Sequence, residues 1–138
     1  MSVVLAKPKC TMLVVDDDRA ILRVFKRILE KKGYSVDTAE TGKEAKARLD
    51  NSRYDAALID LRLPDMEGTD LLPRMQEVAP KMMRIVITGL PFADTVERAD
   101  EAGADAFLQK PVKPEILLDV LEKGMQRKAL DGTAGANN

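Results

Sequence analysis

Short runs of apolar residues alternate along the chain with longer segments in which apolar residues recur every three or four positions. The short runs are typical of strands, and the longer segments are typical of amphipathic helices that bury one face. Strands are predicted at residues 11–15, 34–39, 55–60, 83–88 and 105–109. Helices are predicted at residues 42–51 and 68–79, around residues 93–101, from Pro114 to about residue 128, and over a first segment that Gly33 stops and whose apolar stripe is Ile21, Val24, Phe25, Ile28 and Leu29. The pattern therefore describes five strand–helix pairs.

Glycine and proline residues mark several of the predicted helix boundaries. Gly33 stops the first helix and Gly103 ends the fourth, as glycine often does after a last helical turn. Pro114 suits the first turn of the last helix, where its missing N–H has no helical partner to lose. Pro73 lies inside the third predicted helix, so it either occupies one of the first turns or kinks the helix.

Strands that alternate with helices predict an α/β fold, in which a parallel sheet is covered by helices on both faces. Right-handed crossovers then produce a doubly wound architecture. Ligands of such sheets bind outside the carboxyl ends of the strands, where the strand order reverses. Polar residues follow four of the predicted strands at that edge: Asp16 and Asp17, Asp60, Thr88, and Lys110.

Composition and charge narrow the class of protein. With 138 residues, of which 45% are hydrophobic and 33% charged, the chain is expected to form one soluble globular domain. The net charge of -1 and the lack of a long basic run argue against direct nucleic-acid binding by this domain. No stretch approaches the ~20 apolar residues that a membrane span requires. The single cysteine, Cys10, excludes an internal disulfide and agrees with a cytoplasmic location.

The polar strand ends favour phosphoryl-transfer chemistry. Carboxylates about 4 Å apart repel one another by several kcal/mol, so a hard divalent cation such as Mg²⁺ is expected among Asp16, Asp17 and Asp60. Lys110 and Thr88 can contact phosphoryl oxygens through an ammonium group and a hydroxyl group. Asp60, alone at the end of its strand, is the candidate nucleophile. The adjacent Asp16 and Asp17 are better metal ligands, and Asp18 is expected to cap the first helix.

The segments "LVVDDD", "ALIDLRLPDMEG", "IVITG" and "FLQKPV", in this order and spacing, resemble the receiver domain of two-component response regulators. The resemblance covers residues 10–128. Residues 1–9 are then an N-terminal extension, and residues 129–138 a flexible tail or the start of a linker. The fold that the resemblance implies is flavodoxin-like, with five βα units and the strand order 2-1-3-4-5.

The resemblance also implies roles for particular residues. Asp60 would be the phospho-acceptor, and Lys110 would contact the phosphoryl group. Mg²⁺ would be bound by Asp16, Asp17, Asp60 and the backbone carbonyl of Arg62. The donor would be a phosphohistidine on a sensor histidine kinase or a histidine phosphotransfer protein, which agrees with the absence of histidine from this chain.

Further roles concern the response to phosphorylation. Thr88 and Phe107 would act as switch residues, although Phe107 lacks the hydroxyl of the tyrosine that many receivers carry. The family often has a cis peptide bond before the proline that matches Pro111. Arg62 and Leu90, two residues beyond Asp60 and Thr88, would tune the lifetime of the phosphoryl group. Arg62 would hinder the attacking water sterically or electrostatically, and Leu90 has no polar group to orient it, so slow self-dephosphorylation is expected.

The predicted function is a phosphorylation-dependent switch that is not an enzyme in the usual sense, although it assists its own phosphorylation. Phosphorylation would change the surface formed by residues 93–128, which would bind a downstream effector protein or domain, and dimerisation on phosphorylation stays open.

One alternative is a phosphohydrolase with an aspartyl-phosphate intermediate. Such enzymes need a second carboxylate two residues after the nucleophile, where this chain has Arg62. The other is a receiver used only for binding, which would normally have lost one of the acidic residues or the lysine.

Overall fold

The computed structural model describes residues 10–89 and 93–136 of the 138-residue chain. The expected N-terminal extension, residues 1–9, and Leu90 lie outside the described residues.

Strands and helices alternate along the described chain, as the sequence pattern predicts. The strands are β1 (Thr11–Val15), β2 (Ser35–Ala39), β3 (Ala56–Asp60), β4 (Met83–Thr88) and β5 (Ala106–Gln109). The helices are α1 (Arg19–Lys31), α2 (Gly42–Asn51), α3 (Leu72–Val78), α4 (Ala93–Glu101) and α5 (Pro114–Ala136), and a 3₁₀ helix, η1 (Gly68–Leu71), precedes α3.

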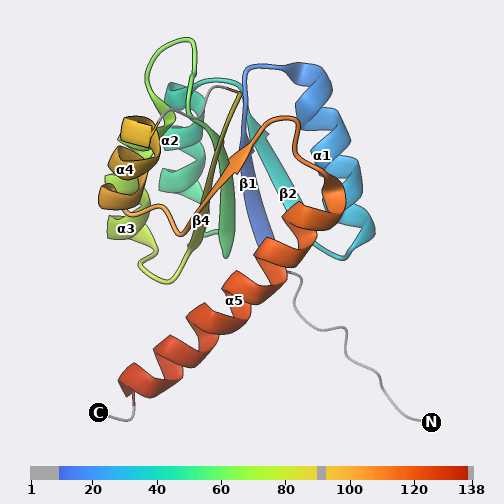
Figure 1. Cartoon of the computed structure of the whole chain (residues 1–138). Coiled ribbons are helices and arrows are strands. Elements are labelled where there is room, and N and C mark those ends of the chain that lie inside the picture. The colour runs from blue at the N-terminus through green and yellow to red at the C-terminus, as the bar shows by residue number, and fades with distance from the viewer. Residues whose placement is uncertain (1–9, 90–92, 137–138) are drawn as a thin grey trace, which may run out of the picture.

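The five strands form one parallel sheet in the order β2-β1-β3-β4-β5, which confirms the predicted α/β topology. Helices α1 and α5 cover one face of the sheet, and α2, α3 and α4 cover the other (Figure 1). The chain runs from β1 outward to β2 and then returns to the other side of β1 with β3. The strand order therefore reverses between β1 and β3, where a ligand site is expected.

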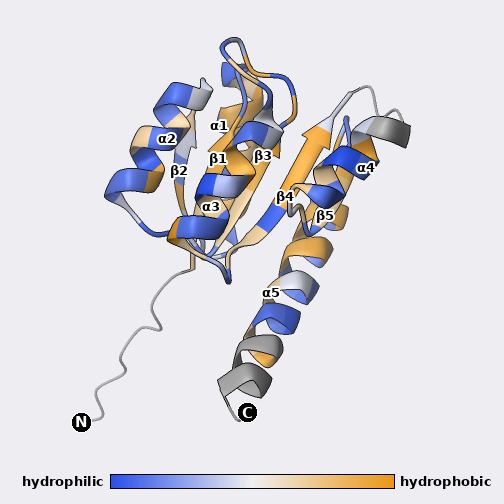
Figure 2. Cartoon of the chain, turned by 90° about the vertical axis from the view of Figure 1, so that its left-hand side faces the viewer, coloured by the Kyte–Doolittle hydropathy of each residue, from blue (hydrophilic) through white to orange (hydrophobic). Residues whose placement is uncertain are grey.

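Alternate residues of each central strand feed two separate cores. Met12 and Val14 of β1 pack with residues of α1 and α5, whereas Leu13 and Val15 pack with residues of α2 and α3. Because both faces are covered, β1, β3 and β4 are apolar along almost their whole length, and Figure 2 shows them in orange between helices with hydrophilic outer surfaces. The cores hold the strand ends rigidly in register.

Two glycines end helices in the way that the sequence predicts. Gly33 has φ +96° and Gly103 has φ +107°, backbone angles that residues with a side chain rarely adopt. Pro73 lies in the first turn of α3, where its missing N–H has no helical partner to lose, and residues 68–71 form the separate 3₁₀ helix η1.

The end of α5 differs from the sequence prediction. The helix continues to Ala136 and extends past the edge of the sheet (Figure 1), so it ends later than predicted, while a flexible tail or linker after residue 128 stays a prediction. No proline interrupts this segment, and Ala129 and Leu130 are good helix formers. Gly132 and Gly135 lower the helix propensity of this segment, but a helix already nucleated by packing needs no new nucleus to continue through them. None of the helices within the described residues has the length and apolar character needed to cross a membrane.

Strand β4 carries one charged residue, Arg84, among apolar neighbours. The side chain of Arg84 is only 4% exposed. Its Nε lies 3.6 Å from Asp105 Oδ2, and Asp105 Oδ1 lies 2.9 Å from Lys128 Nζ on α5. This network is at the start of β4, at the opposite end of the sheet from the polar strand ends.

Candidate functional site

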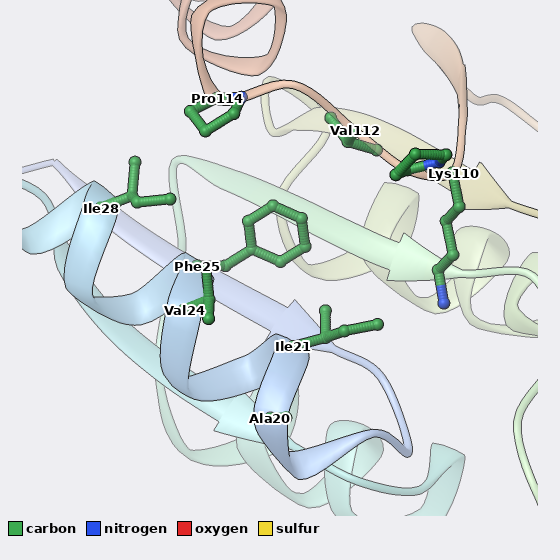
Figure 3. A pocket seen from close by; sticks show the side chains of 9 residues that line it. Ala20, Ile21, Val24, Phe25, Ile28, Lys110, Val112 and Pro114 are labelled. Atoms are coloured by element: carbon green, nitrogen blue, oxygen red, sulfur yellow. The ribbon is translucent and has the colours of Figure 1, made fainter.

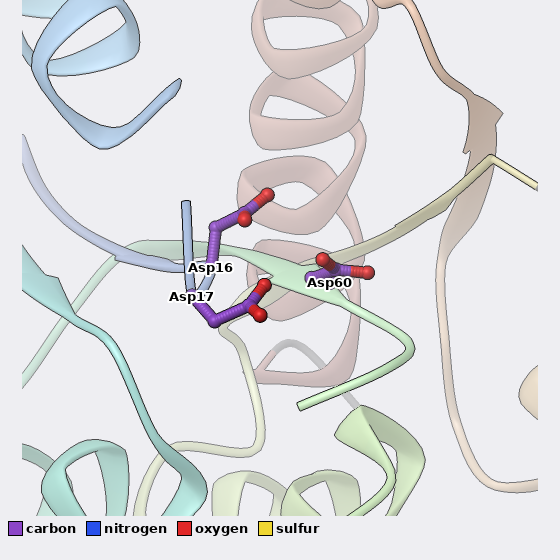
Figure 4. A group of neighbouring side chains, drawn as sticks. All are labelled: Asp16, Asp17 and Asp60. Carbon is purple, nitrogen blue, oxygen red and sulfur yellow. The ribbon is translucent and has the colours of Figure 1, made fainter. Parts of the chain in front are cut away.

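Three carboxylates meet where the strand order reverses. β1 ends at Val15 and leads directly into Asp16 and Asp17, while β3 ends at Asp60. Val15 pairs with Ile59 in the sheet, so the residues that follow the two strands are neighbours. Carboxylate oxygens of Asp16, Asp17 and Asp60 all lie within 4.8 Å of one another, and Figure 4 shows the three side chains gathered at this edge.

Burial makes this cluster electrostatically costly. Asp16 is 0% exposed and Asp60 is 6% exposed, whereas Asp17 is open to solvent. Burial raises the pKa of Asp16, and a backbone hydrogen bond from Asp18 together with the nearby Lys110 offset part of that rise. The charged form of Asp16 is therefore disfavoured unless positive charge lies next to it.

Lys110 supplies positive charge to the cluster. It follows β5, and its Nζ lies 2.9 Å from Asp16 Oδ2 and 2.9 Å from Asp60 Oδ2. Burial lowers the pKa of the Lys110 ammonium group, but its contacts with Asp16 and Asp60 raise the pKa by more. The peptide bond between Lys110 and Pro111 is cis, as the family resemblance predicts, and Lys110 N donates to Thr88 O at 2.8 Å.

The donor set fits a hard divalent cation. All three side chains offer carboxylate oxygens, which Mg²⁺ and Ca²⁺ prefer. Asp16 Oδ2 is fully buried and accepts no hydrogen bond within the described residues, although it lies beside Lys110. A buried carboxylate oxygen left with a single ionic contact is suited to a metal ion. The cluster can therefore hold a metal.

The other predicted site residues surround this cluster. Arg62 N donates to Asp60 Oδ1 at 3.1 Å, so the backbone of Arg62 is adjacent to the site while its side chain is exposed. Thr88 is 2% exposed at the end of β4, next to β3. Phe107 lies on β5, half-buried against the core on the α2–α3 face.

The first helix is capped as the sequence predicts. Asp18 Oδ1 accepts hydrogen bonds from Ala20 N at 2.9 Å and Ile21 N at 3.3 Å, at the start of α1. Of the three consecutive aspartates, Asp16 and Asp17 therefore face the cluster, and Asp18 stabilises the helix.

No local sequence pattern marks Asp65, which the structure places in contact with a distant helix. Its Oδ1 accepts from Gly42 N at 2.8 Å and its Oδ2 accepts from Lys43 N at 2.9 Å. The hydrogen bonds from Gly42 and then Lys43 hold the pKa of Asp65 below its ordinary value. A contact between residues more than twenty positions apart leaves no periodic signal, so only the folded chain reveals it.

An apolar groove of about 600 Å³ opens beside the cluster. Ile21, Val24 and Phe25 of α1 form one wall, and Val112 and Pro114 lie opposite. Lys110 lies at the end of this groove, and its ammonium group points away from the apolar wall (Figure 3). The groove and the acidic cluster therefore share one residue.

Comparison with known protein families agrees with this geometry. A model of the response regulator receiver domain matches residues 12–122, which is most of the chain. The chain belongs to the response regulator receiver family. Receiver domains of response regulators are signalling switches and not classical enzymes, and the phosphohydrolase alternative is not favoured.

Individual receiver proteins are similar over nearly the same residues. The chain is 39% identical over 119 residues to AlgB of Pseudomonas aeruginosa, an alginate biosynthesis transcriptional regulatory protein, covering 86% of this chain and 26% of AlgB. The chain spans about a quarter of the length of AlgB and of GlrR from Escherichia coli.

Solved receiver structures share the fold. A CheY-like receiver domain protein from Methanospirillum hungatei has a TM-score of 0.86 and 39% identity, covering 90% of this chain and 99% of that one. A response regulator protein from Burkholderia pseudomallei with a phosphorylated aspartic acid and a calcium ion has a TM-score of 0.80 and 26% identity, covering 92% of this chain and 75% of that one.

Proposed function

We propose that this receiver domain accepts a phosphoryl group on Asp60 in a Mg²⁺-dependent reaction. The observation that carries the proposal is the meeting of Asp16, Asp17 and Asp60 within 4.8 Å, with Lys110 Nζ 2.9 Å from Asp60 Oδ2. In the reaction a carboxylate oxygen of Asp60 bonds to phosphorus, the P–N bond of a phosphohistidine breaks, and the electron pair leaves with the imidazole. The phosphorylated aspartate and calcium ion of the Burkholderia pseudomallei protein support this assignment.

Asp16, Asp17, Asp60 and the backbone carbonyl of Arg62 are the proposed ligands of Mg²⁺. When bound there, Mg²⁺ supplies positive charge that offsets the negative charge of the carboxylates and the incoming phosphoryl group. Lys110 contacts the phosphoryl oxygens, and Thr88 donates its hydroxyl to one of them. The domain thereby assists its own phosphorylation by placing charges around Asp60.

Arg62 and Leu90 are proposed to lengthen the lifetime of the phosphoryl group. Hydrolysis needs a water molecule that attacks phosphorus in line with the Asp60 oxygen. The backbone of Arg62 adjoins Asp60, and in this proposal its exposed side chain hinders that approach, while an apolar Leu90 offers no group to orient the water. The proposal is therefore slow self-dephosphorylation.

Thr88 and Phe107 are the proposed switch residues. Thr88 O accepts from Lys110 N at 2.8 Å, so the end of β4 and the lysine are mechanically linked. Phe107 and Val96 line a hollow of about 380 Å³ between α4 and β5. A movement of Thr88 toward the phosphoryl group would change the space open to Phe107, and so reshape the surface of α4, β5 and α5 that binds an effector.

The proposed partners are a sensor histidine kinase or histidine phosphotransfer protein as donor and an effector protein or domain as target. The apolar groove beside Lys110 gives a donor protein a surface next to Asp60.

Residues 10–128 are the proposed receiver unit, and the last turns of α5 are the start of a linker if the chain continues. We place the domain in the cytoplasm, with neither nucleic acid nor membrane as a direct partner, and phosphorylation-induced dimerisation is open to test.

The proposal is tested by incubating the protein with Mg²⁺ and a small acyl phosphate and measuring its intact mass. The expected result is one added phosphoryl group, absent from Asp60→Asn and from samples in chelator. Rapid turnover of the donor without an adduct would instead support a phosphohydrolase. Neither adduct nor turnover would support a module used only for binding.

A further inference from the structure

The segment between β3 and η1 folds back on itself as a small hairpin, which we call the 61–68 hairpin. Gly68 N donates to Leu61 O at 2.6 Å, and Leu63 N donates to Met66 O at 3.1 Å. Between these two bonds, Arg62 and Glu67 form an antiparallel bridge. The hairpin is thus held at its base and near its tip, and Asp65 is at the tip.

The base of this hairpin packs directly against Asp60, the proposed phospho-acceptor. A Cβ atom at Gly68 would lie 2.1 Å from Asp60 O, so only glycine allows this approach. Arg62 N donates to Asp60 Oδ1 at 3.1 Å. A displacement of the hairpin would therefore move the Arg62 backbone relative to the Asp60 side chain.

The tip of the hairpin is fixed to the start of α2 by two independent contacts. The carboxylate of Asp65 accepts from Gly42 N and Lys43 N through separate oxygens, at 2.8 and 2.9 Å. The side chain of Met66 fills the space where a Cβ of Gly42 would lie, since such an atom would be 2.2 Å from Met66 Sδ. Asp65 is thus joined to the first turn of a helix that begins 23 residues earlier.

Helix α2 does not depend on Asp65 for its own cap. Thr41, the N-cap residue, accepts through Oγ1 from Glu44 N at 3.0 Å, and Glu44 Oε2 accepts from Glu40 N at 3.1 Å, so residues 40–44 cap the helix locally. The bonds from Asp65 are additional and connect two segments that are distant in sequence.

The start of α2 is in turn tied to the acidic cluster. Asp16 N donates to Ala39 O at 3.0 Å, at the end of β2 and just before α2. A closed path of contacts therefore runs from Asp16 through the start of α2 to Asp65, and through the hairpin to Asp60. Within this path Asp65 is the residue that joins the hairpin to the start of α2.

We infer that Asp65 is a positioning residue of the phosphorylation site: by binding the first turn of α2 it fixes the hairpin that carries Arg62 against Asp60. The inference rests on the proposed function, because it concerns the same metal and phosphoryl site. Asp65 touches neither the metal ligands' side chains nor the acceptor, so it acts through the hairpin. Residues that orient a metal site from outside its ligand shell commonly change metal affinity about 10-fold or more when removed.

The test compares Asp65→Ala with Thr41→Ala, a matched control that removes a cap from the same helix but leaves the hairpin attached. Mg²⁺ affinity is measured by isothermal titration calorimetry, and phosphorylation by a small acyl phosphate is followed by intact mass. For Asp65→Ala we expect a rise in the Mg²⁺ dissociation constant of about 10-fold and slower phosphorylation. For Thr41→Ala we expect both quantities to stay within about twofold of wild type, because the hairpin is still held.

A conservative variant separates positioning from a loss of folding. Asp65→Asn keeps one carbonyl acceptor and loses the other, so its Mg²⁺ dissociation constant should lie between those of wild type and Asp65→Ala. Equal weakening by Thr41→Ala and Asp65→Ala would overturn the inference, as would wild-type Mg²⁺ binding in Asp65→Ala. A wild-type protein that takes up no phosphoryl group would instead overturn the proposed function, and the inference with it.

Discussion

At the scale of single residues, the site is a compromise between burial and charge. Asp16 is fully buried yet lies beside Asp60, and Lys110 offsets only part of their repulsion. Burial raises the pKa of Asp16, so keeping it ionised at neutral pH costs folding free energy. A cation bound among the carboxylates would offset this cost by neutralising their charge.

Asp16→Asn is therefore expected to stabilise the metal-free protein, on the order of 1 kcal/mol, because it removes a buried charge while Lys110 keeps its contact with Asp60. The same variant should lose most of the stabilisation that wild type gains from Mg²⁺. Urea unfolding in chelator and in Mg²⁺ measures both effects. A variant that is less stable than wild type in chelator would contradict this account.

A second residue-scale prediction concerns Tyr54, which is 5% exposed and donates to Asp37 Oδ2 at 2.6 Å. Burial, followed by the hydrogen bond to Asp37, raises the pKa of Tyr54 to about 12. A raised pKa means that the protonated phenol stabilises the fold, fully below about pH 10 and progressively less as the pH approaches 12.

Tyr54→Phe should lower the free energy of unfolding by about 1 kcal/mol at pH 8, through the lost hydrogen bond. The difference between wild type and variant should shrink toward pH 12. Tyr34, whose pKa burial also raises, is present in both proteins and cancels in the comparison. Urea unfolding at pH 8 and 11 tests this, and a difference that grows with pH would count against it.

At the scale of secondary-structure elements, α5 is anchored by the network at the start of β4. Asp105 accepts from Arg84 N at 2.8 Å, faces the buried Arg84 side chain, and pairs with Lys128 of α5. One carboxylate thus connects three elements, β4, the segment before β5, and α5.

Asp105→Ala should destabilise the protein by about 3 kcal/mol, because it leaves the Arg84 side chain buried without an opposite charge. The exposed pair Asp119–Lys123 on the same helix is the control, with side chains 59% and 73% exposed. Asp119→Ala should cost less than about 0.5 kcal/mol. A similar decrease in the free energy of unfolding for both variants would contradict the claim that the buried Arg84 needs Asp105 as its opposite charge.

The boundaries of the elements show what sequence patterns can and cannot provide. The limits of α2 and the end of α4 agree with the sequence prediction, and Gly33 and Gly103 follow the ends of α1 and α4, because these signals are local. The end of α5 was predicted too early, because the small and polar residues after Lys128, Gly132 and Gly135 among them, are typical of a helix end, yet the helix continues through them. The sequence shows the charge of Arg84 within β4 but not its partner, because Asp105 lies 21 residues away.

At the scale of the whole molecule, parallel strands bring chemically distinct residues to one edge. Asp16, Asp60, Thr88 and Lys110 could be predicted as neighbours because each follows a strand of the same sheet. The contact of Asp65 with α2 could not be predicted, since nothing in the sequence fixes how the loops above the sheet touch. The site is thus placed by topology, whereas its supporting contacts are visible only in the structure.

The central claim is that these strand ends form a Mg²⁺-dependent acceptor site in which Asp60, and not Asp16 or Asp17, takes the phosphoryl group. The most direct measurement is to locate that group: reduce the acyl-phosphate-treated protein with borohydride, which converts an aspartyl phosphate to homoserine, and sequence the peptides by tandem mass spectrometry. The account predicts homoserine at position 60 alone, and only when Mg²⁺ was present. Homoserine at position 16 or 17, or at position 60 in the presence of chelator, would contradict it.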